Sequence, residues 1–485
     1  MKNRRKFLKN SALLGTGFFI VPRNVLGGPG FISPSDQLNI AAIGAGGKGY
    51  DITNKWASGE RVIALCDVHP DKKDVINARK KYPNANVYVD FREMLDNEKD
   101  LDAVTVSTPD HTHGIIASNA MNRGLHAYVQ KPLTHNIEEA RKLTQIAKKN
   151  KVVTQMGNQG GSSTGVVKIQ EWVDKKMIGK IHKIYAWTNR PVWPQGFPME
   201  DRSEEKPANL NWDLWLGPAS YTKYTSQLHP FNWRGWWDYG TGALGDMGCH
   251  ILDAPYKTLG LHYPTDVECS VGSVFQQAWS QNFIPEGCPP SSIVTLHFDK
   301  TKKNDSKIEL VWMDGGLRPN HPEDIPADDY LGEVNSTNGV LMIGEKGVIS
   351  CGVYGLEPKL YRKGKETLKF KTESKLLDHD HHMEWINGIK GGYGSAAYEK
   401  ITAPFEYAGP FTETVLMGNL AIRSYMSMGK EKPKYYPDRY HTSEYGKFVG
   451  RKKLLWDGDN MRITNFDEAN QFVGRIRRSG WEFYI

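Results

Sequence analysis

Residues 39–49 read NIAAIGAGGKG, and this stretch decides the fold of the first part of the chain. Its first five residues form a short apolar run, as expected for a buried parallel strand. Gly44, Gly46 and Gly49 then fill the three positions of the pattern G-x-G-x-x-G. In a strand–turn–helix unit, the first glycine permits a tight turn, the second admits a pyrophosphate and the third lets the helix pack on the strand. The stretch therefore predicts a dinucleotide-binding loop, which includes Gly47.

An acidic residue follows the second predicted strand. A helix-compatible stretch at 50–57 leads to the apolar run Arg61–Cys66, which ends at Asp67, 18 residues past Gly49. An acid at this distance is expected to hydrogen-bond the ribose hydroxyls of a dinucleotide, although an ordinary aspartate at a strand end is the alternative. The acid would repel the 2′-phosphate of NADP, and no arginine follows it immediately. We therefore predict that Asp67 binds the ribose and that the cofactor is NAD rather than NADP.

Strands and helices continue to alternate as far as Asn158. The predicted elements are the strands 101–107, 125–129 and 152–156 and the helices 115–123 and 137–150. Such alternation predicts a doubly wound parallel sheet, a Rossmann domain, over residues 37–158. Ligands bind to these sheets beyond the carboxyl ends of the strands. The segments 108–113 and 130–132 follow two of those ends and are therefore expected at the binding site.

The second half of the chain has a different pattern. After Gln159 the strict alternation stops, and strand-like runs recur at 181–187, 266–275, 292–298, 307–313 and around 339–350. This pattern predicts a second α/β domain with an antiparallel or mixed sheet over residues 159–485, and we expect this domain to bind the substrate. Tryptophan-containing loops at 192–198 and 212–218 could offer flat apolar faces to a sugar ring, although such side chains more often belong to a core.

The segment GTGALGDMGCHILD, residues 240–253, contains candidate catalytic groups. Asp246 and His250 are four residues apart, so on a helix they share one face, and Asp253 falls three residues further on the same side. A carboxylate beside an imidazole can raise its basicity and fix its tautomer. Such a pair could take a hydroxyl proton while hydride leaves the carbon. The alternative interpretation is a surface or capping arrangement.

Taken together, these motifs resemble the glucose–fructose oxidoreductase / inositol dehydrogenase / MocA (Gfo/Idh/MocA) family. The resemblance rests on the segments 44–49, 107–113, 130–132 and 245–253, and on WDLWLGP at 212–218. It implies a Rossmann domain followed by an α/β domain with an open, mainly antiparallel sheet. Two later stretches are similar to an exported, sugar-related branch of the family, namely 212–218 and Glu413-Thr414-Val415-Leu416 with Asn419.

The resemblance also implies roles for individual residues. By analogy, the catalytic residues Lys131, Asp246 and His250 surround the substrate carbon that faces the nicotinamide. The family's E-K-P motif appears here as Gln130-Lys131-Pro132, so the lysine is retained and the glutamate is replaced. A cis peptide before Pro132 is expected, which would suit a sharp turn at a strand end.

Further cofactor contacts are implied at the ends of the strands. Thr108, Pro109, His113 and Lys131 are expected to bind NAD together with the glycine loop. His113 and Tyr239 are weaker catalytic candidates, and each is at least as readily explained by a structural role.

The N-terminal residues 1–30 are predicted to be a signal peptide and linker. Arg4 and Arg5 precede an apolar run at 12–21, which is too short to span a bilayer and resembles a twin-arginine export signal. A basic tail is the alternative. Six of the positive charges lie before Asp36, where no acid occurs, so the net charge of +7 falls to nearly +1 in the mature chain. We therefore expect a periplasmic protein without a membrane anchor after signal removal, and no nucleic-acid partner.

No metal site is predicted. The five cysteines are far apart and lack C-x-x-C spacing, which argues against a disulfide framework and against a zinc site. The segment DHDHH at 378–382 has imidazoles and carboxylates at a spacing that can bind zinc or nickel. We favour the simpler interpretation, which is a solvated helix start.

An export signal and an NAD site conflict, because free NAD is not expected to be regenerated outside the cytoplasm. We therefore expect an oxidoreductase acting on a sugar, polyol or glycoside that keeps NAD bound through a redox-neutral cycle. One alternative is an NAD-dependent glycosidase or lyase that acts by oxidation, elimination, hydration and reduction. Another is a non-catalytic sugar-binding protein. A homo-oligomer, either a dimer or a tetramer, is expected in each case.

Overall fold

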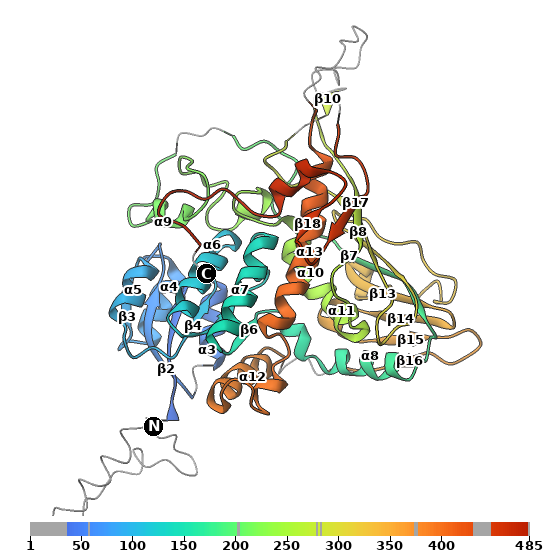
Figure 1. Cartoon of the computed structure of the whole chain (residues 1–485), viewed down its shortest axis with the longest axis horizontal. Helices are drawn as coiled ribbons and strands as arrows, with labels where there is room; N and C mark the ends of the chain where they lie inside the picture. Colours follow the sequence, from blue (N-terminus) through green and yellow to red (C-terminus); the bar gives the residue numbers. More distant parts are fainter. Residues whose placement is uncertain are drawn as a thin grey trace, which may run out of the picture.

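The computed structural model describes residues 36–56, 59–200, 204–277, 280–281, 284–372, 377–429 and 448–483. Two domains lie side by side, one built on a six-stranded sheet and the other on a ten-stranded sheet (Figure 1). The predicted signal segment at 1–30, with Arg4 and Arg5, lies outside the described residues. Within the described part of the chain, no helix has both the length and the apolar character needed to cross a membrane.

The first domain is the predicted Rossmann fold, with parallel strands in the order β3-β2-β1-β4-β5-β6. Ile43 pairs with Cys66 on one side and Val106 on the other, so the carboxyl ends of three strands meet at one edge. The strands are β1 (Asn39–Ile43), β2 (Arg61–Cys66), β3 (Asn86–Tyr88), β4 (Ala103–Val106), β5 (His126–Val129) and β6 (Thr154–Met156). The helices between them are α3 (Lys48–Trp56), α4 (Lys73–Lys81), α5 (Phe91–Asn97), α6 (Asp110–Asn122) and α7 (Ile137–Asn150).

Helix α6 begins earlier than the sequence pattern predicts. It starts at Asp110 rather than at Ile115, because Pro109 serves as its N-cap residue and Asp110 lies in the first turn. An acid there interacts favourably with the helix dipole. The segment 108–113 is therefore not a loop throughout, and its side chains from Asp110 onward project from the first turn of a helix.

Helix α12 (Leu377–Gly391) returns to the first domain from far along the chain (Figure 1). Its Trp385 and Ile386 are buried in one apolar cluster with Ile40 and Val153. The sheet of the first domain therefore gains a covering helix from beyond residue 158, so the spatial domain includes more than the predicted span 37–158.

The same helix corrects the interpretation of the segment 378–382. A helix does form there, but His381 and His382 are buried rather than solvated. His381 Nε2 lies 2.8 Å from the Met156 carbonyl oxygen, and the His382 ring stacks on Tyr128 at a centroid distance of 4.7 Å. Among the residues that the structure describes, no group of three or more histidine, cysteine or acidic side chains could hold a metal ion.

The second domain contains the predicted open, mainly antiparallel sheet, in the order β16-β15-β14-β13-β7-β12-β11-β8-β17-β18. Only β7 and β12 pair in parallel among these described strands. The strands are β7 (Ile181–Thr188), β8 (Asp266–Val271), β11 (Ser292–Phe298), β12 (Ile308–Met313), β13 (Asn338–Gly344), β14 (Gly347–Cys351), β15 (Lys359–Tyr361), β16 (Leu368–Lys369), β17 (Leu454–Asp457) and β18 (Arg462–Ile463). The predicted strand 266–275 ends at Val271, and Phe275 begins a separate short strand, β9 (Phe275–Gln277).

Helices join the two domains. The long helix α13 (Phe405–Tyr425) packs on α7 of the first domain and on β8 and β11 of the second. Helices α8 (Thr164–Asp174), α10 (Gly242–Ile251) and α11 (Asp253–Leu259) also belong to the second domain. Helix α10 contacts α13 and β7, and its Asp246 accepts a hydrogen bond from Lys131 just past β5, so the predicted catalytic segment lies beside the strand ends of the first domain.

Candidate functional site

The glycine loop after β1 has the tight geometry that a dinucleotide-binding loop needs. Gly44 has φ +76°, and a Cβ there would lie 2.7 Å from the carbonyl oxygen of Ser107. A Cβ on Gly49 would overlap the Gly44 carbonyl oxygen, and one on Gly46 would lie 2.9 Å from Val75 Cγ2. Helix α3 begins directly at this loop, so its N-terminus faces the space above it. The loop therefore fits the pyrophosphate of a dinucleotide.

Asp67 lies where the sequence predicts an acid for the ribose. It follows β2, and its carboxylate accepts hydrogen bonds from the Gly46 N–H at 3.1 Å and the His69 N–H at 3.0 Å. Burial raises the pKa of this carboxyl, while the two N–H donors act in the opposite direction. Lys72 lines the same cavity, which gives the ribose end a cation that the sequence reasoning did not consider.

A single cavity of about 450 Å³ joins both domains. Most of the predicted site residues line it, namely Gly44, Gly46, Gly47, Asp67, Thr108, Pro109, His113, Lys131 and His250. Gly49 and Asp246 do not. Gly49 lies under the loop, where it allows α3 to approach β1, and Asp246 lies behind Lys131. The cavity therefore connects the glycine loop to the predicted catalytic end.

Lys131 and Asp246 lie at the centre of the predicted catalytic end of the cavity. The Lys131 Nζ donates to Asp246 Oδ1 at 2.9 Å and to the Asp246 carbonyl oxygen at 2.6 Å, and the peptide between Lys131 and Pro132 is cis, as the resemblance implied. Arg234 Nε also donates to Asp246 Oδ1, at 3.2 Å. Burial alone would raise the pKa of Asp246, but the charges of Lys131 and Arg234 hold it well below its usual range. Asp246 is therefore an ionised anchor for two cations.

His250 projects into the cavity one helical turn beyond Asp246. Its ring lies edge-on to Tyr354 at a centroid distance of 4.8 Å, and its Nδ1 is buried without a hydrogen-bond partner among the described residues. Burial, and then the charge of Lys131, hold the pKa of this imidazole well below its usual value. The ring is therefore neutral near pH 7 and can accept a proton.

Two further polar residues line the cavity and were not singled out by the sequence analysis. Asp110 accepts a hydrogen bond from Thr241 Oγ1 at 2.6 Å, and burial raises the pKa of its carboxyl. Arg234 lies over the rings of Trp233 and Phe231, at 4.2 and 4.6 Å from their centroids. In the sequence, Asp110 could have been noticed as an acid directly after Pro109, and Arg234 as a cation within an aromatic-rich stretch. Neither signal identifies a site residue without the fold.

Three of the catalytic candidates make structural contacts, and of these only His113 lines the cavity. The interpretation that Asp253 shares the face of His250 is wrong, because α10 ends at Ile251 and Asp253 begins α11, where it accepts a hydrogen bond from the Tyr407 hydroxyl outside the cavity. Tyr239 packs in an aromatic cluster against Trp215. Both ring nitrogens of His113 lie within 2.9 Å of backbone carbonyl oxygens, those of Pro132 and Thr108. His113 therefore supports the cis turn that positions Lys131.

His111, next to this site, is expected to make the protein less stable in mild acid. Its side chain is fully buried, and burial lowers its pKa to about 3. An unfolded histidine titrates near pH 6.5, so the unfolded state binds a proton that the folded state does not. The free energy of unfolding is therefore highest above pH 6.5. It decreases as the pH falls toward 3, and the loss is about 2 kcal/mol at pH 5.

Urea unfolding at pH 7 and pH 5 tests this expectation. His111→Gln should reduce the pH-dependent difference in unfolding free energy, whereas His182→Gln, a change at an exposed histidine, should preserve it. An unchanged difference in His111→Gln would contradict the assignment.

The fold and this cavity define a two-domain α/β protein whose first domain is a Rossmann domain. Residues 38–158 match the oxidoreductase family described as having an NAD-binding Rossmann fold, and residues 163–280 match the C-terminal alpha/beta domain of the same family. These consecutive matches and the two-domain fold support membership of the Gfo/Idh/MocA oxidoreductase family.

Two curated relatives are similar over part of the chain. The levoglucosan dehydrogenase of Pseudarthrobacter phenanthrenivorans is 22% identical over 232 residues, which are 46% of this chain and 52% of that protein. The alpha-N-acetylgalactosaminidase of Shewanella oneidensis is 29% identical over 171 residues, which are 30% of this chain and 37% of that protein. The chain thus spans about half of the first relative and little over a third of the second.

Solved structures share the fold over more of the chain. The WlbA dehydrogenase from Bordetella pertussis, in complex with NADH and UDP-GlcNAcA, has a TM-score of 0.54 and 12% identity, covering 80% of this chain and 97% of that one. UDP-N-acetylglucosamine 3-dehydrogenase from Acidithiobacillus ferrooxidans has a TM-score of 0.52 and 15% identity, covering 81% and 99%. At these identities the likeness shows the common fold.

Proposed function

We propose that the protein is an NAD-dependent oxidoreductase that acts on a sugar, a polyol or a glycoside and keeps its cofactor bound between turnovers. The observation that carries this proposal is the single cavity that joins the glycine loop to Lys131 and His250. Relatives named as a levoglucosan dehydrogenase and an alpha-N-acetylgalactosaminidase support a carbohydrate substrate. Asp67 favours NAD, since an acid beside the ribose repels the 2′-phosphate of NADP.

Different residues of the chain would hold the cofactor, bind the reacting hydroxyl and accept its proton. Bound NAD supplies the hydride acceptor, and Gly44, Gly46 and Asp67 would hold it. Lys131 donates a hydrogen bond to the oxygen of the reacting hydroxyl, since its ammonium lies in the cavity wall and is oriented by Asp246. His250 accepts the proton that this hydroxyl loses, because its imidazole is neutral and faces the same cavity.

The proposal that NAD stays bound between turnovers rests on a second proposal, that the protein is located in the periplasm. Arg4 and Arg5 favour export to the periplasm by the twin-arginine route, in which the protein is exported already folded. A protein folded around its cofactor carries NAD to a compartment where free NAD is not expected. The cycle must then be redox-neutral, with hydride returned to a sugar before the next turnover.

Nucleotide analysis and product analysis together test this function. Wild-type protein purified from the periplasm is denatured, and released nucleotide is identified by mass spectrometry, with NAD expected in near-equal amount to protein. Products from a panel of sugars and glycosides are then followed by mass spectrometry and NADH absorbance. Protein that contains no nucleotide and turns over only with excess NAD would overturn the resident-cofactor proposal, whereas absence of any sugar product would overturn the activity.

A second candidate is an NAD-dependent glycosidase, favoured by the similarity to the alpha-N-acetylgalactosaminidase. Oxidation of a ring hydroxyl makes the adjacent C–H acidic, its proton is removed and the aglycone leaves with the bonding electrons. Water then adds to the carbon that carried the aglycone, and a solvent proton returns to the neighbouring carbon that had lost its proton. The carbonyl is then reduced again. This route does not need the paired carboxylates of ordinary glycosidases.

Turnover in D₂O distinguishes the two candidates. The glycosidase route is expected to release the aglycone without net NADH and to place one deuterium on the carbon next to the oxidised carbon, because that position takes its proton from solvent. Simple oxidoreduction leaves every C–H bond adjacent to the reacting carbon unlabelled when the product is analysed at once. Aglycone release without deuterium in the sugar would contradict the glycosidase route.

A further inference from the structure

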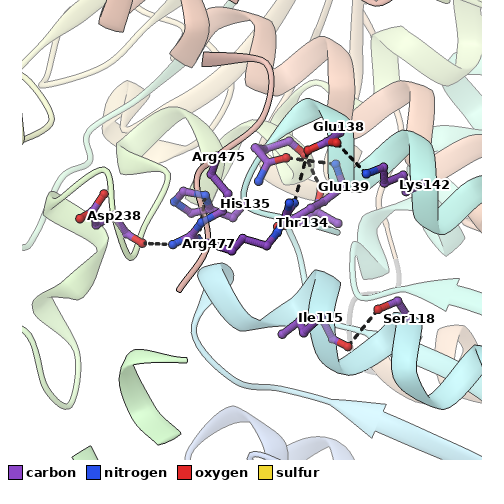
Figure 2. A network of polar contacts seen from close by, with 11 residues as sticks. Ile115, Ser118, Thr134, His135, Glu138, Glu139, Lys142, Asp238, Arg475 and Arg477 are labelled. Carbon is purple, nitrogen blue, oxygen red and sulfur yellow. Dashed lines mark hydrogen bonds and ion pairs between the residues drawn. The ribbon is translucent and has the colours of Figure 1, made fainter. Parts of the chain in front are cut away.

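The C-terminal segment of the described chain crosses from the second domain to the first. Residues 474–483 leave the end of the second domain and run back to the Rossmann domain (Figure 1). Figure 2 shows Arg475 and Arg477 of this segment beside His135, Glu138 and Glu139 at the start of α7. The segment therefore passes over the boundary between the two domains.

Arg477 anchors the segment to the first domain. Its Nη2 donates to Glu139 Oε1 at 3.0 Å and lies 3.4 Å from Glu138 Oε2. The Glu139 side chain is 1% exposed, so this carboxylate depends on a cation for compensation of its buried charge. The anchor is consequently part of the folded structure and not a loose surface contact.

Arg478 joins the segment to a loop whose Leu214 and Trp215 line the cavity. It donates to the Gly217 carbonyl oxygen at 2.8 Å and to Asp213 Oδ1 at 2.6 Å. These residues belong to the loop that contains α9 (Trp212–Leu216). The Asn211 N–H of the same loop donates to the Val68 carbonyl oxygen at 2.9 Å, directly after Asp67. Arg478 thus holds a loop of the second domain down against the predicted ribose site.

Trp481 reaches the cavity itself. Its indole lines the same cavity as Asp67 and is 6% exposed. It lies 6.2 Å from the Phe91 ring, and the Arg92 guanidinium sits 4.7 Å from its centroid. Phe91 follows β3, which lies beyond β2 in the sheet and away from Lys131. Since the acid after β2 marks the ribose of the adenosine, Trp481 lies at the adenosine end.

We infer that residues 474–483 form part of the cofactor site, with Trp481 as a wall of the adenosine pocket and Arg478 as the residue that keeps the 211–217 loop closed over it. The dinucleotide then leaves only when this segment lifts from the first domain. The inference rests on the proposed function in that NAD is the ligand, and it gives the retention of NAD a physical cause. Trp481 contacts the cofactor, whereas Arg477 and Arg478 are positioning residues.

The test is the dissociation rate of NADH from loaded full-length protein, measured by stopped-flow fluorescence with excess NAD as the competitor. Trp481→Ala is expected to release NADH about 10- to 100-fold faster, the effect of losing one aromatic stacking contact with a base. Trp481→Phe should give an intermediate rate, and Arg478→Gln should also accelerate release. The matched control is Arg462→Gln, since Arg462 is 56% exposed and its ion pair with Asp467 is 3.7 Å long.

Circular dichroism and thermal melting of each variant separate this role from a purely structural one. A lower melting temperature with wild-type NADH release in Trp481→Phe and Arg478→Gln would overturn the inference. Accelerated release at an unchanged circular dichroism spectrum supports it, even if no sugar is turned over, because loss of turnover would contradict only the proposed function. A wild-type protein that binds no NADH would overturn both.

Discussion

Replacement of Lys131 by methionine is expected to lower kcat by about 10²- to 10⁴-fold while NAD remains bound, the range usual for loss of a proton-handling or orienting group. Methionine keeps the apolar stem but removes the ammonium that faces the cavity and bonds to Asp246. The glycine loop and Asp67 stay intact, so nucleotide content measured after denaturation should equal that of the wild type. Steady-state kinetics on the substrate found by product analysis gives the comparison.

Two variants sharpen this expectation. Lys175→Met is the matched control, because Lys175 is 63% exposed, pairs with Glu171 and lies outside the cavity, so its kcat should be that of the wild type. Asp246→Asn should also lower kcat without loss of NAD, since Asp246 acts by holding Lys131 and Arg234. If Lys131→Met kept the wild-type kcat, the reaction would have to be assigned to another part of the cavity, away from Lys131.

Local signals explain which parts of the fold could be predicted. Helix α7 has the predicted bounds, Ile137–Asn150, because Asn136 accepts a hydrogen bond from the Glu139 N–H as an N-cap residue. The glycine loop is partly local, since Gly49 must lack a side chain because of the Gly44 carbonyl oxygen five residues earlier, whereas Gly44 and Gly46 are packed against Ser107 and Val75. Helix α6 was mispredicted at its start because Pro109 and Asp110 are typical of both a turn and a helix N-terminus.

Contacts between distant residues explain what the sequence pattern missed. His381 and His382 belong to a hydrophilic stretch, yet they are buried because hydrogen bonding to Met156 and stacking on Tyr128 compensate them. Arg234 joins the site only because Asp246 on α10 is brought beside it. Periodicity reports which face of an element is apolar, but it does not identify the distant element that covers that face. The full set of residues at the catalytic end of the cavity could therefore be identified only from the three-dimensional structure.

The largest expected effect on cofactor binding is that of a substitution at Gly49. Gly49→Val is expected to weaken NADH binding by at least about 100-fold, because its Cβ would overlap the Gly44 carbonyl oxygen and overpacking of about 3 kcal/mol must displace either the loop or α3. Fluorescence titration with NADH measures the change. Gly124→Ala is the control, since Gly124, unlike Gly49, has a positive φ, +81°, and has no atom within 4 Å of an added Cβ. That control should lose some stability through backbone strain and keep its affinity for NADH, so it shows whether a general loss of stability is enough to weaken binding. Equal affinities in the two variants would mean that the close approach of α3 to β1 is not what shapes the pyrophosphate site, and Asp67 and the closing segment would then have to account for NADH binding.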